Sequence, residues 1–371
     1  MRTAIVHYWM INMRGGEKVL EALCEAYPDA DIFTHVYAPE EMSATINSHQ
    51  VYTTFISKLP RASRWYQKYL PLMPLALEEL DLTEYDLIIS SESGPAKGVI
   101  TRPDSTHICY CHSPMRYLWD QYHLYRQNAG LVTRTLMPVL AHYLRMWDIS
   151  TASRVDKFIA NSRSIRARIK KFYRRDADVI HPPCDVDAFV PAPDHEIGNY
   201  YLAVGQLVAY KRFDIAVRAF TQSGKKLVVI GEGEERTRLE AIAGDSVTFL
   251  GKAPFELLKH HYSRCRALIF PGEEDFGIVP VEAMASGRPV IAYKRGGALD
   301  TVVQGLTGHF FAEQSPTALA KAVDEFESEL HLYEPAKISA AAQKYSRERF
   351  IQNIKLTVER EVRNNQQSLS N

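Results

Sequence analysis

The sequence has few cysteines and no excess of charge of either sign. Five cysteines in 371 residues are too few, and odd in number, for a disulfide scaffold, so the reduced thiols of a cytosolic protein fit better. Lys plus Arg number 44 and Asp plus Glu number 44, so no net field draws the chain to nucleic acid. Apolar residues make up 46% and charged residues 24%, a composition that excludes disordered, collagen-like and coiled-coil classes.

Long apolar runs are also missing. No run reaches the ~18–20 residues needed to span a bilayer, so any membrane contact is expected to be peripheral. The opening stretch MRTAIVHYWMI has no small-residue cleavage site and is typical of a first strand. We therefore expect no signal peptide and a cytoplasmic location.

The length and the prolines predict two domains. A chain of 371 residues corresponds to two domains of ordinary size. Apolar runs alternate with helical segments in both halves, which is typical of parallel sheets covered by helices on both faces. Four prolines fall between residues 182 and 194, so we place the boundary there. The prediction is an α/β protein with two doubly wound domains, 1–183 and 184–345, and an interdomain cleft at the carboxyl ends of the strands.

Continuous apolar runs predict strands at 4–6, 86–90, 107–110 and 157–160, and then at 201–204, 227–230, 247–250, 267–270 and 290–293. A helix is expected over 17–26, and a basic helix capped by Asn161 or Ser162 is expected to reach Tyr173. The helical segment around 346–365 is a candidate to pack back on the N-terminal domain. The polar tail, 364–371, is expected to be frayed.

The most informative stretch is PGEEDFGIVPVEAMASGRPVIAYKRGG, residues 271–297. It follows an apolar strand, so its loop is expected at a carboxyl end, where such sheets bind ligands. Pro280 suits the first position of a short helix, which would put Glu282 in the first turn and Glu274 in the loop. Both glutamates can also be read as solvated charges. The positive end of that helix would present oxygen-binding amides from Phe276, Gly277 and Ile278.

A basic pair follows the first strand of the second half, in GQLVAYKRFD, residues 205–214. When a sugar–diphosphate bond breaks, negative charge grows on the departing phosphate, and fixed cations at Lys211 and Arg212 would stabilise it. An exposed basic pair is the other interpretation. Cations oppose the positive end of the helix that follows, which mildly favours an anionic ligand.

Two segments of the first half contain further candidates. Gly15 and Gly16 let backbone amides approach a phosphate closely, or equally form a tight turn. The stretch HICYCHSPMRYLWDQY, 107–122, crowds histidines and cysteines without the spacing of a structural zinc site. His112 lies just beyond the strand, where the loop is expected to open at the carboxyl edge.

Two basic stretches contain almost no acids. Residues 57–70, SKLPRASRWYQKYL, have none, and residues 153–175 carry nine basic residues and one acid. Basic side chains interleaved with aromatic ones, here Arg61, Arg64, Trp65 and Lys68, suit an anionic membrane interface. A solvated basic face is the alternative. Nucleic acid is not predicted, because the chain is neutral and no binding motif accompanies the patches.

Taken together, these motifs resemble the family-four retaining glycosyltransferases, whose GT-B fold has two facing Rossmann-like domains. EEDFGIVPVEAMASGRPV is similar to the family's motif of two glutamates separated by seven residues, which are Glu274 and Glu282 here. Six other segments follow the family's order: RGGEKVLEAL, FIANSRSIRARI, GQLVAYKRFDIAVRAF, VVIGEGEER, VTFLGK and GGALDTV. The resemblance covers nearly the whole chain.

The resemblance implies roles for individual residues. Glu274 would contact the donor sugar and Glu282 the ribose hydroxyls, while Lys211 matches the family's lysine at the leaving phosphate. Gln206, a donor-side residue, stands where an arginine is usual. We therefore expect Arg212, where many relatives have glycine, to supply that charge. The remaining implied or candidate positions are Gly15 and Gly16 at a phosphate, His112 at the transferred sugar, and Arg116 and Asp120 on the acceptor side.

The expected function is transfer of a sugar from a nucleotide diphosphate, best fitted by GDP-mannose, to a polyprenyl-diphosphate-linked glycan in exopolysaccharide, capsule or O-antigen assembly. Similarity of YKRFD and CYCHSPMRYLWDQY to mannosyltransferases of bacterial surface-polysaccharide assembly favours this donor. The alternatives are a UDP- or dTDP-sugar donor, an epimerase or phosphorylase on the same architecture, and a module that binds sugar nucleotide or lipid without turnover. No cofactor or divalent metal is required, and the expected location is peripheral, on an anionic inner membrane face.

Overall fold

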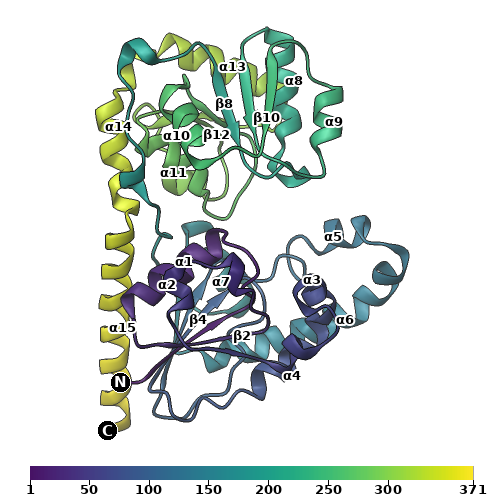
Figure 1. The fold of residues 1–371 in the computed structure, drawn as a ribbon, viewed down its shortest axis with the longest axis vertical. Helices are drawn as coiled ribbons and strands as arrows, with labels where there is room; N and C mark the ends of the chain where they lie inside the picture. Colours follow the sequence, from purple (N-terminus) through teal and green to yellow (C-terminus); the bar gives the residue numbers. More distant parts are fainter. Residues whose placement is uncertain (371) are drawn as a thin grey trace. The chain divides into compact units, whose positions relative to one another are not determined.

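The chain divides into two compact units (Figure 1). Unit 1 contains Met1–Pro183 together with the chain from Phe350 onward, and unit 2 contains Cys184–Arg349. The structure is a computed structural model and describes residues 1–370. The chain first passes from unit 1 to unit 2 between Pro183 and Cys184, inside the proline-rich segment of residues 182–194.

Unit 1 is built on a seven-stranded parallel sheet in the order β3-β2-β1-β4-β5-β6-β7. The order reverses between β1 and β4, so unit 1 has a topological switch point there, the place where such sheets bind ligands at their carboxyl ends. The strands are β1 (Thr3–His7), β2 (Asp31–Thr34), β3 (Val51–Thr53), β4 (Leu87–Glu92), β5 (Thr106–Cys111), β6 (Lys157–Ala160) and β7 (Ala177–Val179).

Helices cover both faces of this sheet. Alternate residues of a strand point to opposite faces, so each buried strand supplies apolar side chains to both helical layers. Ile5, Ile89 and Ile108 pack on α1 (Gly15–Ala26) and α15 (Arg347–Ser370), whereas Val6 and Ile88 pack on α4 (Met73–Glu78) and α6 (Leu131–Thr151). Burying each such aliphatic side chain contributes roughly 1.5–3 kcal/mol. The helices of unit 1 are α1 (Gly15–Ala26), α2 (Ala44–Asn47), α3 (Ala62–Trp65), α4 (Met73–Glu78), α5 (Tyr122–Asn128), α6 (Leu131–Thr151) and α7 (Arg163–Tyr173), with most of α15 (Arg347–Ser370).

Unit 2 has a six-stranded parallel sheet in the order β10-β9-β8-β11-β12-β13, with its switch point between β8 and β11. The strands are β8 (Tyr201–Val204), β9 (Leu227–Ile230), β10 (Val247–Gly251), β11 (Leu268–Phe270), β12 (Val290–Tyr293) and β13 (Gly308–Phe311). The helices are α8 (Phe213–Ser223), α9 (Arg236–Ala241), α10 (Phe255–Arg264), α11 (Ile278–Ala285), α12 (Ala298–Thr301), α13 (Pro316–Ser328) and α14 (Pro335–Ala342).

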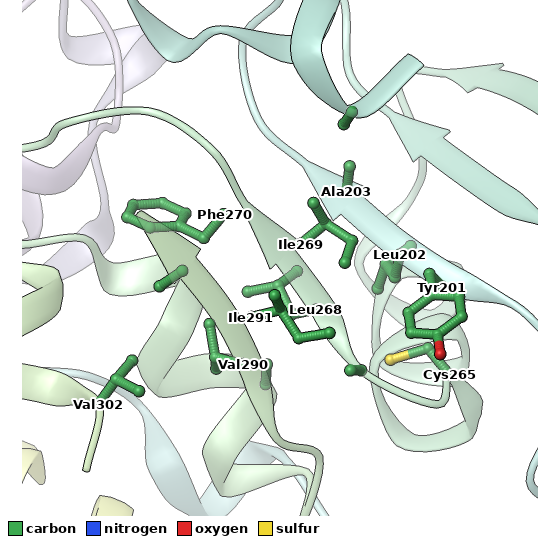
Figure 2. Close-up of a cluster of buried hydrophobic side chains, with 14 of the residues drawn as sticks. Tyr201, Leu202, Ala203, Cys265, Leu268, Ile269, Phe270, Val290, Ile291 and Val302 are labelled. Atoms are coloured by element: carbon green, nitrogen blue, oxygen red, sulfur yellow. The ribbon is translucent and has the colours of Figure 1, made fainter. Parts of the chain in front are cut away.

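A single apolar cluster forms the core of unit 2. Its central strands are apolar on both faces, as expected for a parallel sheet covered on both sides. Figure 2 shows side chains of three neighbouring strands of this cluster: Tyr201, Leu202 and Ala203 of β8, Leu268, Ile269 and Phe270 of β11, and Val290 and Ile291 of β12. This core holds the carboxyl ends of β8 and β11 in fixed register.

The structure confirms the two-sheet Rossmann-like architecture and corrects several local predictions. Strands β2, β3, β7 and β13 were not predicted, and neither was the hairpin of α5 and α6. The basic helix is α7, with the Ser162 hydroxyl accepting from the Ile165 amide at 3.2 Å. The tail prediction was wrong: α15 continues to Ser370, and Asn365 donates to the Ser105 carbonyl at 3.1 Å. Asn371 lies outside the described residues.

Candidate active site

A lysine–glutamate pair spans the switch point of unit 2. Lys211 follows β8 and Glu274 follows β11, and the Lys211 Nζ lies 3.0 Å from the Glu274 Oε1. The two loops approach so closely that a Cβ at Gly272 would lie 2.8 Å from the Lys211 Cα. Burial would lower the pKa of Lys211, but Glu274, together with Tyr210 and Glu282, outweighs it and raises this pKa, so the lysine stays charged at neutral pH.

Arg212, the neighbouring cation, is held in a strained conformation. Its φ of 54° and ψ of 36° lie in the left-handed region, which costs a residue with a Cβ about 1–2 kcal/mol. The guanidinium forms two hydrogen bonds with Asp214, at 3.1 and 3.3 Å. Gln206 is exposed two residues after the end of β8 in the same loop. Strain of this kind clusters at functional sites, which fits the predicted role of Arg212.

The second glutamate lies on α11 and is bound to a tyrosine. The Glu282 Oε2 accepts a hydrogen bond of 2.7 Å from the Tyr262 hydroxyl. Burial raises the pKa of Glu282, and the Tyr262 hydrogen bond opposes this rise. The helix begins at Ile278 rather than at Pro280, so Glu282 lies in the second turn, not the first as predicted. Proline is tolerated in a first turn, which is why Pro280 gave the wrong start.

The three predicted donor amides surround the start of α11. Gly277 is the N-cap residue, with a φ of 87°, and Ile278 is the first helical residue. Helix-forming hydrogen bonds leave the first amides without partners inside the helix, so they can bind oxygen atoms of a ligand. The Phe276 side chain is buried, with its ring 5.5 Å from that of Tyr345. A Cβ at Gly297 would lie 2.2 Å from the Phe276 Cα, so the absence of a side chain at Gly297 allows this close packing.

His112, in unit 1, belongs to a buried chain of hydrogen-bonding groups. Its Nε2 lies 2.9 Å from the Ser91 Oγ, which in turn lies 3.0 Å from the His7 Nδ1. Burial and the neighbouring His7 lower the pKa of His112 to about 3, so this imidazole is neutral at physiological pH. Sequence reasoning missed His7 and Ser91. The available signal was a polar residue at the end of each of two apolar strands.

The glycine loop adjoins this chain. Gly15 and Gly16 are the first two residues of α1, and a Cβ at Gly16 would lie 2.1 Å from the Tyr8 hydroxyl oxygen. Packing against Tyr8 is therefore sufficient to require Gly16. The Glu17 Oε2 accepts a hydrogen bond of 3.0 Å from the Arg14 amide and caps the start of α1.

The acceptor-side candidates lie elsewhere in unit 1. Asp120 pairs with Arg168 of α7 at 3.2 Å, and Arg116 is partly buried. Trp65 has two cations over its ring, with the Arg61 Cζ at 4.9 Å and the Lys68 Nζ at 4.4 Å. Arg61, Arg64 and Lys68 are exposed.

The cysteine- and histidine-rich strand is part of the core. His107, Cys109 and Cys111 are fully buried in β5, and the His107 Nε2 lies 2.9 Å from the Ser90 Oγ. Within residues 1–370, no group of three His, Cys, Asp or Glu side chains is arranged to hold a metal ion. In the same part of the chain, no helix is both long enough and apolar enough to cross a membrane.

Comparison with known families accounts for nearly the whole chain. Residues 13–188 match the family described as Glycosyltransferase Family 4, and residues 191–348 match Glycosyl transferases group 1. The chain belongs to the family-four glycosyltransferases. Its two Rossmann-like units have the GT-B fold, which the sequence motifs had indicated.

Similar curated proteins include several mannosyltransferases. The O-antigen chain mannosyltransferase RfbU of Salmonella typhimurium is 30% identical over 161 residues, covering 40% of this chain and 45% of the relative. The α-1,3/1,6-mannosyltransferase ALG2 of mouse is 25% identical over 319 residues, covering 72% and 73%. The chain spans about half the length of the Salmonella relative and of a D-inositol 3-phosphate glycosyltransferase from Streptomyces scabiei, of which 49% is covered.

Solved structures share the fold. Anabaena HepE in complex with UDP and glucose has a TM-score of 0.67 at 18% identity, covering 97% of this chain and 99% of HepE. Sucrose-phosphate synthase from Thermosynechococcus elongatus has a TM-score of 0.70 at 20% identity, with the same coverage. Similarity at these identities concerns the fold alone.

Proposed function

We propose that this glycosyltransferase is a retaining mannosyltransferase that uses GDP-mannose and extends a lipid-linked glycan. The observation that carries the proposal is the charged Lys211 beside Glu274, at the switch point of unit 2 and in the same loop system as the start of α11. A lysine held charged in a largely buried position suits a diphosphate, and the first amides of α11 suit its oxygens.

In the proposed reaction, the bond between the anomeric carbon of the sugar and the phosphate oxygen breaks, and its electron pair remains on that oxygen. The Lys211 ammonium, the Arg212 guanidinium and the first amides of α11 stabilise the growing charge. The acceptor hydroxyl attacks the same face of the sugar, and its proton passes to the departing phosphate. No carboxylate acts as a nucleophile in this scheme, which leaves Glu274 to bind the sugar and Glu282 the ribose.

The choice of mannose rests on the mannosyltransferases among the relatives. GDP is the nucleotide that the sequence motifs favoured. A UDP- or dTDP-sugar donor is the main alternative, since a structural neighbour was solved with UDP. A module that binds nucleotide or lipid without turnover is the alternative from another class.

A lipid-linked acceptor is supported by an apolar stripe on α6. Val132, Leu136, Val139, Tyr143 and Met146 repeat at helical spacing and are 45–73% exposed. Residues 121–147 contain no Asp or Glu but include Arg126, Arg134 and Arg145. Together with the exposed cations around Trp65, this stripe has the chemistry of a surface that lies on an anionic bilayer. The proposed location is therefore peripheral, on the inner face of the cell membrane.

Thermal unfolding with a panel of GDP-, UDP- and dTDP-sugars tests the donor. A ligand at a hundred times its dissociation constant adds about 2.7 kcal/mol to the free energy of unfolding, so GDP-mannose should raise the melting temperature most. Product analysis with a polyprenyl-diphosphate glycan then tests the reaction. The proposal requires release of GDP and an α-linked mannose with unchanged anomeric configuration. Stabilisation by donor without release of nucleoside diphosphate would favour the binding module.

A further inference from the structure

Three neighbouring strands of unit 1 place contacting side chains at or beside their carboxyl ends. The sheet order places β1, β4 and β5 side by side, and His7 is the register partner of Ser91. His112 follows the last residue of β5. The hydroxyl of Ser91 therefore bridges two imidazoles, 3.0 Å from the His7 Nδ1 and 2.9 Å from the His112 Nε2.

Burial restricts how the protons are arranged in this chain. His7 and Ser91 are 1% and 0% exposed, so they must satisfy their polar atoms mainly with one another. The His7 Nε2 has no hydrogen-bond partner within the described residues, and a carboxylate oxygen of Glu17 lies 3.8 Å from it. A lone pair on this nitrogen would face the carboxylate and be repelled by it, whereas an N–H group would be attracted. The arrangement favours a proton on the His7 Nε2.

The remaining protons follow from that one. When His7 carries a single ring proton, on Nε2, its Nδ1 is bare and accepts a hydrogen bond from the Ser91 hydroxyl. Because the single proton of the Ser91 hydroxyl points to His7, Ser91 cannot donate to His112 and can only accept a hydrogen bond from it. The His112 Nε2 therefore carries a proton, and the His112 Nδ1 carries a lone pair. In the opposite arrangement, both the His7 Nε2 and the Glu17 carboxylate would present lone pairs to each other.

We propose that His7 and Ser91 are positioning residues that fix the tautomer of His112, so that the His112 Nδ1 accepts a hydrogen bond from a hydroxyl of the transferred sugar. The tautomer assignment depends only on the contacts in unit 1. The identity of the hydroxyl rests on the proposed function. His112 is the residue that touches the sugar, and the other two act through it.

The sheet contains a matched control for Ser91. The adjacent Ser90 is also fully buried, and its hydroxyl also lies 2.9 Å from the Nε2 of a histidine, His107. The substitutions Ser91→Ala and Ser90→Ala each remove one fully buried hydroxyl; the first breaks the hydrogen bonds to His7 and His112, and the second breaks the hydrogen bond to His107. Only the first breaks the proposed chain.

The test combines histidine 15N NMR of the full chain with steady-state kinetics. Protonated and bare ring nitrogens differ in 15N shift, and the absence of one signal set in His112→Gln assigns His112. We expect the wild type to have a proton on Nε2 and a bare Nδ1. In S91A, the Nδ1-protonated form should appear and kcat should fall about tenfold with little change in the donor KM, whereas S90A should change neither.

Two variants of His7 provide a second route if S91A does not fold. Asparagine and leucine have similar size, but only the asparagine side chain can accept from Ser91. His7→Asn should preserve the His112 tautomer and most of the turnover, and His7→Leu should lose both. A wild-type proton on Nδ1, an S91A enzyme with unchanged tautomer and kcat, or equal losses in H7N and H7L would each overturn the proposal. An enzyme with the expected tautomer that transfers no sugar would instead overturn the proposed function.

Discussion

The Lys211 Nζ lies 3.0 Å from the Glu274 Oε1 and joins the loops that follow β8 and β11 across the switch point of unit 2. In this state the lysine neutralises a carboxylate. A bound diphosphate would compete for the same ammonium and leave Glu274 available to a sugar hydroxyl. The pair therefore links phosphate binding to sugar binding through a single cation, and the catalytic part of the account depends on it.

Lys211→Ala should lower kcat about 10²–10³-fold, because one preorganised charge at a departing phosphate is worth that much. Steady-state kinetics with the preferred donor measure the loss, and a thermal melt checks that the variant is folded. Lys337→Ala is the control, since Lys337 also pairs with a glutamate, Glu334 at 2.7 Å, but is exposed. A folded K211A enzyme with near-normal turnover would remove Lys211 from the mechanism.

Arg212→Gly distinguishes the effect of backbone strain on stability from the effect of the guanidinium charge on turnover. Glycine adopts a φ of 54° without penalty, so the free energy of unfolding should rise by up to about 1 kcal/mol, while loss of the guanidinium should lower kcat. Arg174→Gly is the matched control, because Arg174 has a φ of 57° at the C-cap of α7 and no proposed role in the site. It should raise stability with unchanged turnover. An R212G enzyme that is stabilised and fully active would show that the arginine does not serve the leaving group.

Acid should destabilise unit 1 through buried neutral histidines. Burial lowers the pKa of His35 to about 4, against an ordinary value of 6.5. Between these values the unfolded chain binds the proton and the folded chain does not. The contribution of neutral His35 to the free energy of unfolding is therefore complete above about pH 6.5 and is lost as the pH falls towards 4. Across this interval one such group contributes roughly 3 kcal/mol.

His35→Asn should flatten this pH dependence. Denaturant unfolding between pH 7 and pH 4 measures it as the difference in slope between the variant and the wild type. The Thr54 hydroxyl, which lies 3.0 Å from the His35 Nδ1, can still bond to the asparagine side chain. Parallel stability curves for the two proteins would contradict the assignment of acid sensitivity to His35.

Membrane binding should require both the cations around Trp65 and the stripe on α6. The wild-type protein should sediment together with vesicles rich in anionic lipid. Changing Arg61, Arg64 and Lys68 to Glu, or Leu136 and Val139 to Asp, should release it. Changing three exposed lysines of unit 2 to Glu alters the net charge equally and should leave binding intact; these are Lys252, Lys321 and Lys337. Release by the unit 2 changes alone would mean that net charge, not this surface, controls binding.

The sequence was most informative where a strand is continuously apolar. Runs such as 227–230 and 290–293 match β9 and β12, because burial on both faces leaves no room for polar residues. Strands β2 and β13 were missed, since each has only four residues and begins with Asp31 or Gly308, residues that are disfavoured in strands. Their pairing with β1 and β12, which were predicted, decides their structure.

The candidate site was predictable where its residues follow a recognisable apolar strand. Lys211, Glu274 and Glu282 lie in recognisable motifs beside apolar strands. His7 and Ser91 are 84 positions apart, and only the register of β1 and β4 brings them together. Sequence patterns do not specify such a contact until the strand order is known.

A crystal structure with the preferred nucleotide sugar bound would locate the diphosphate relative to Lys211 and the start of α11. We expect a phosphate oxygen within hydrogen-bonding distance of the Lys211 Nζ, the amides of Gly277 and Ile278 facing the diphosphate, and Glu274 bound to the sugar. A structure in which the Lys211–Glu274 pair is intact and the diphosphate is bound away from the start of α11 would contradict this expectation.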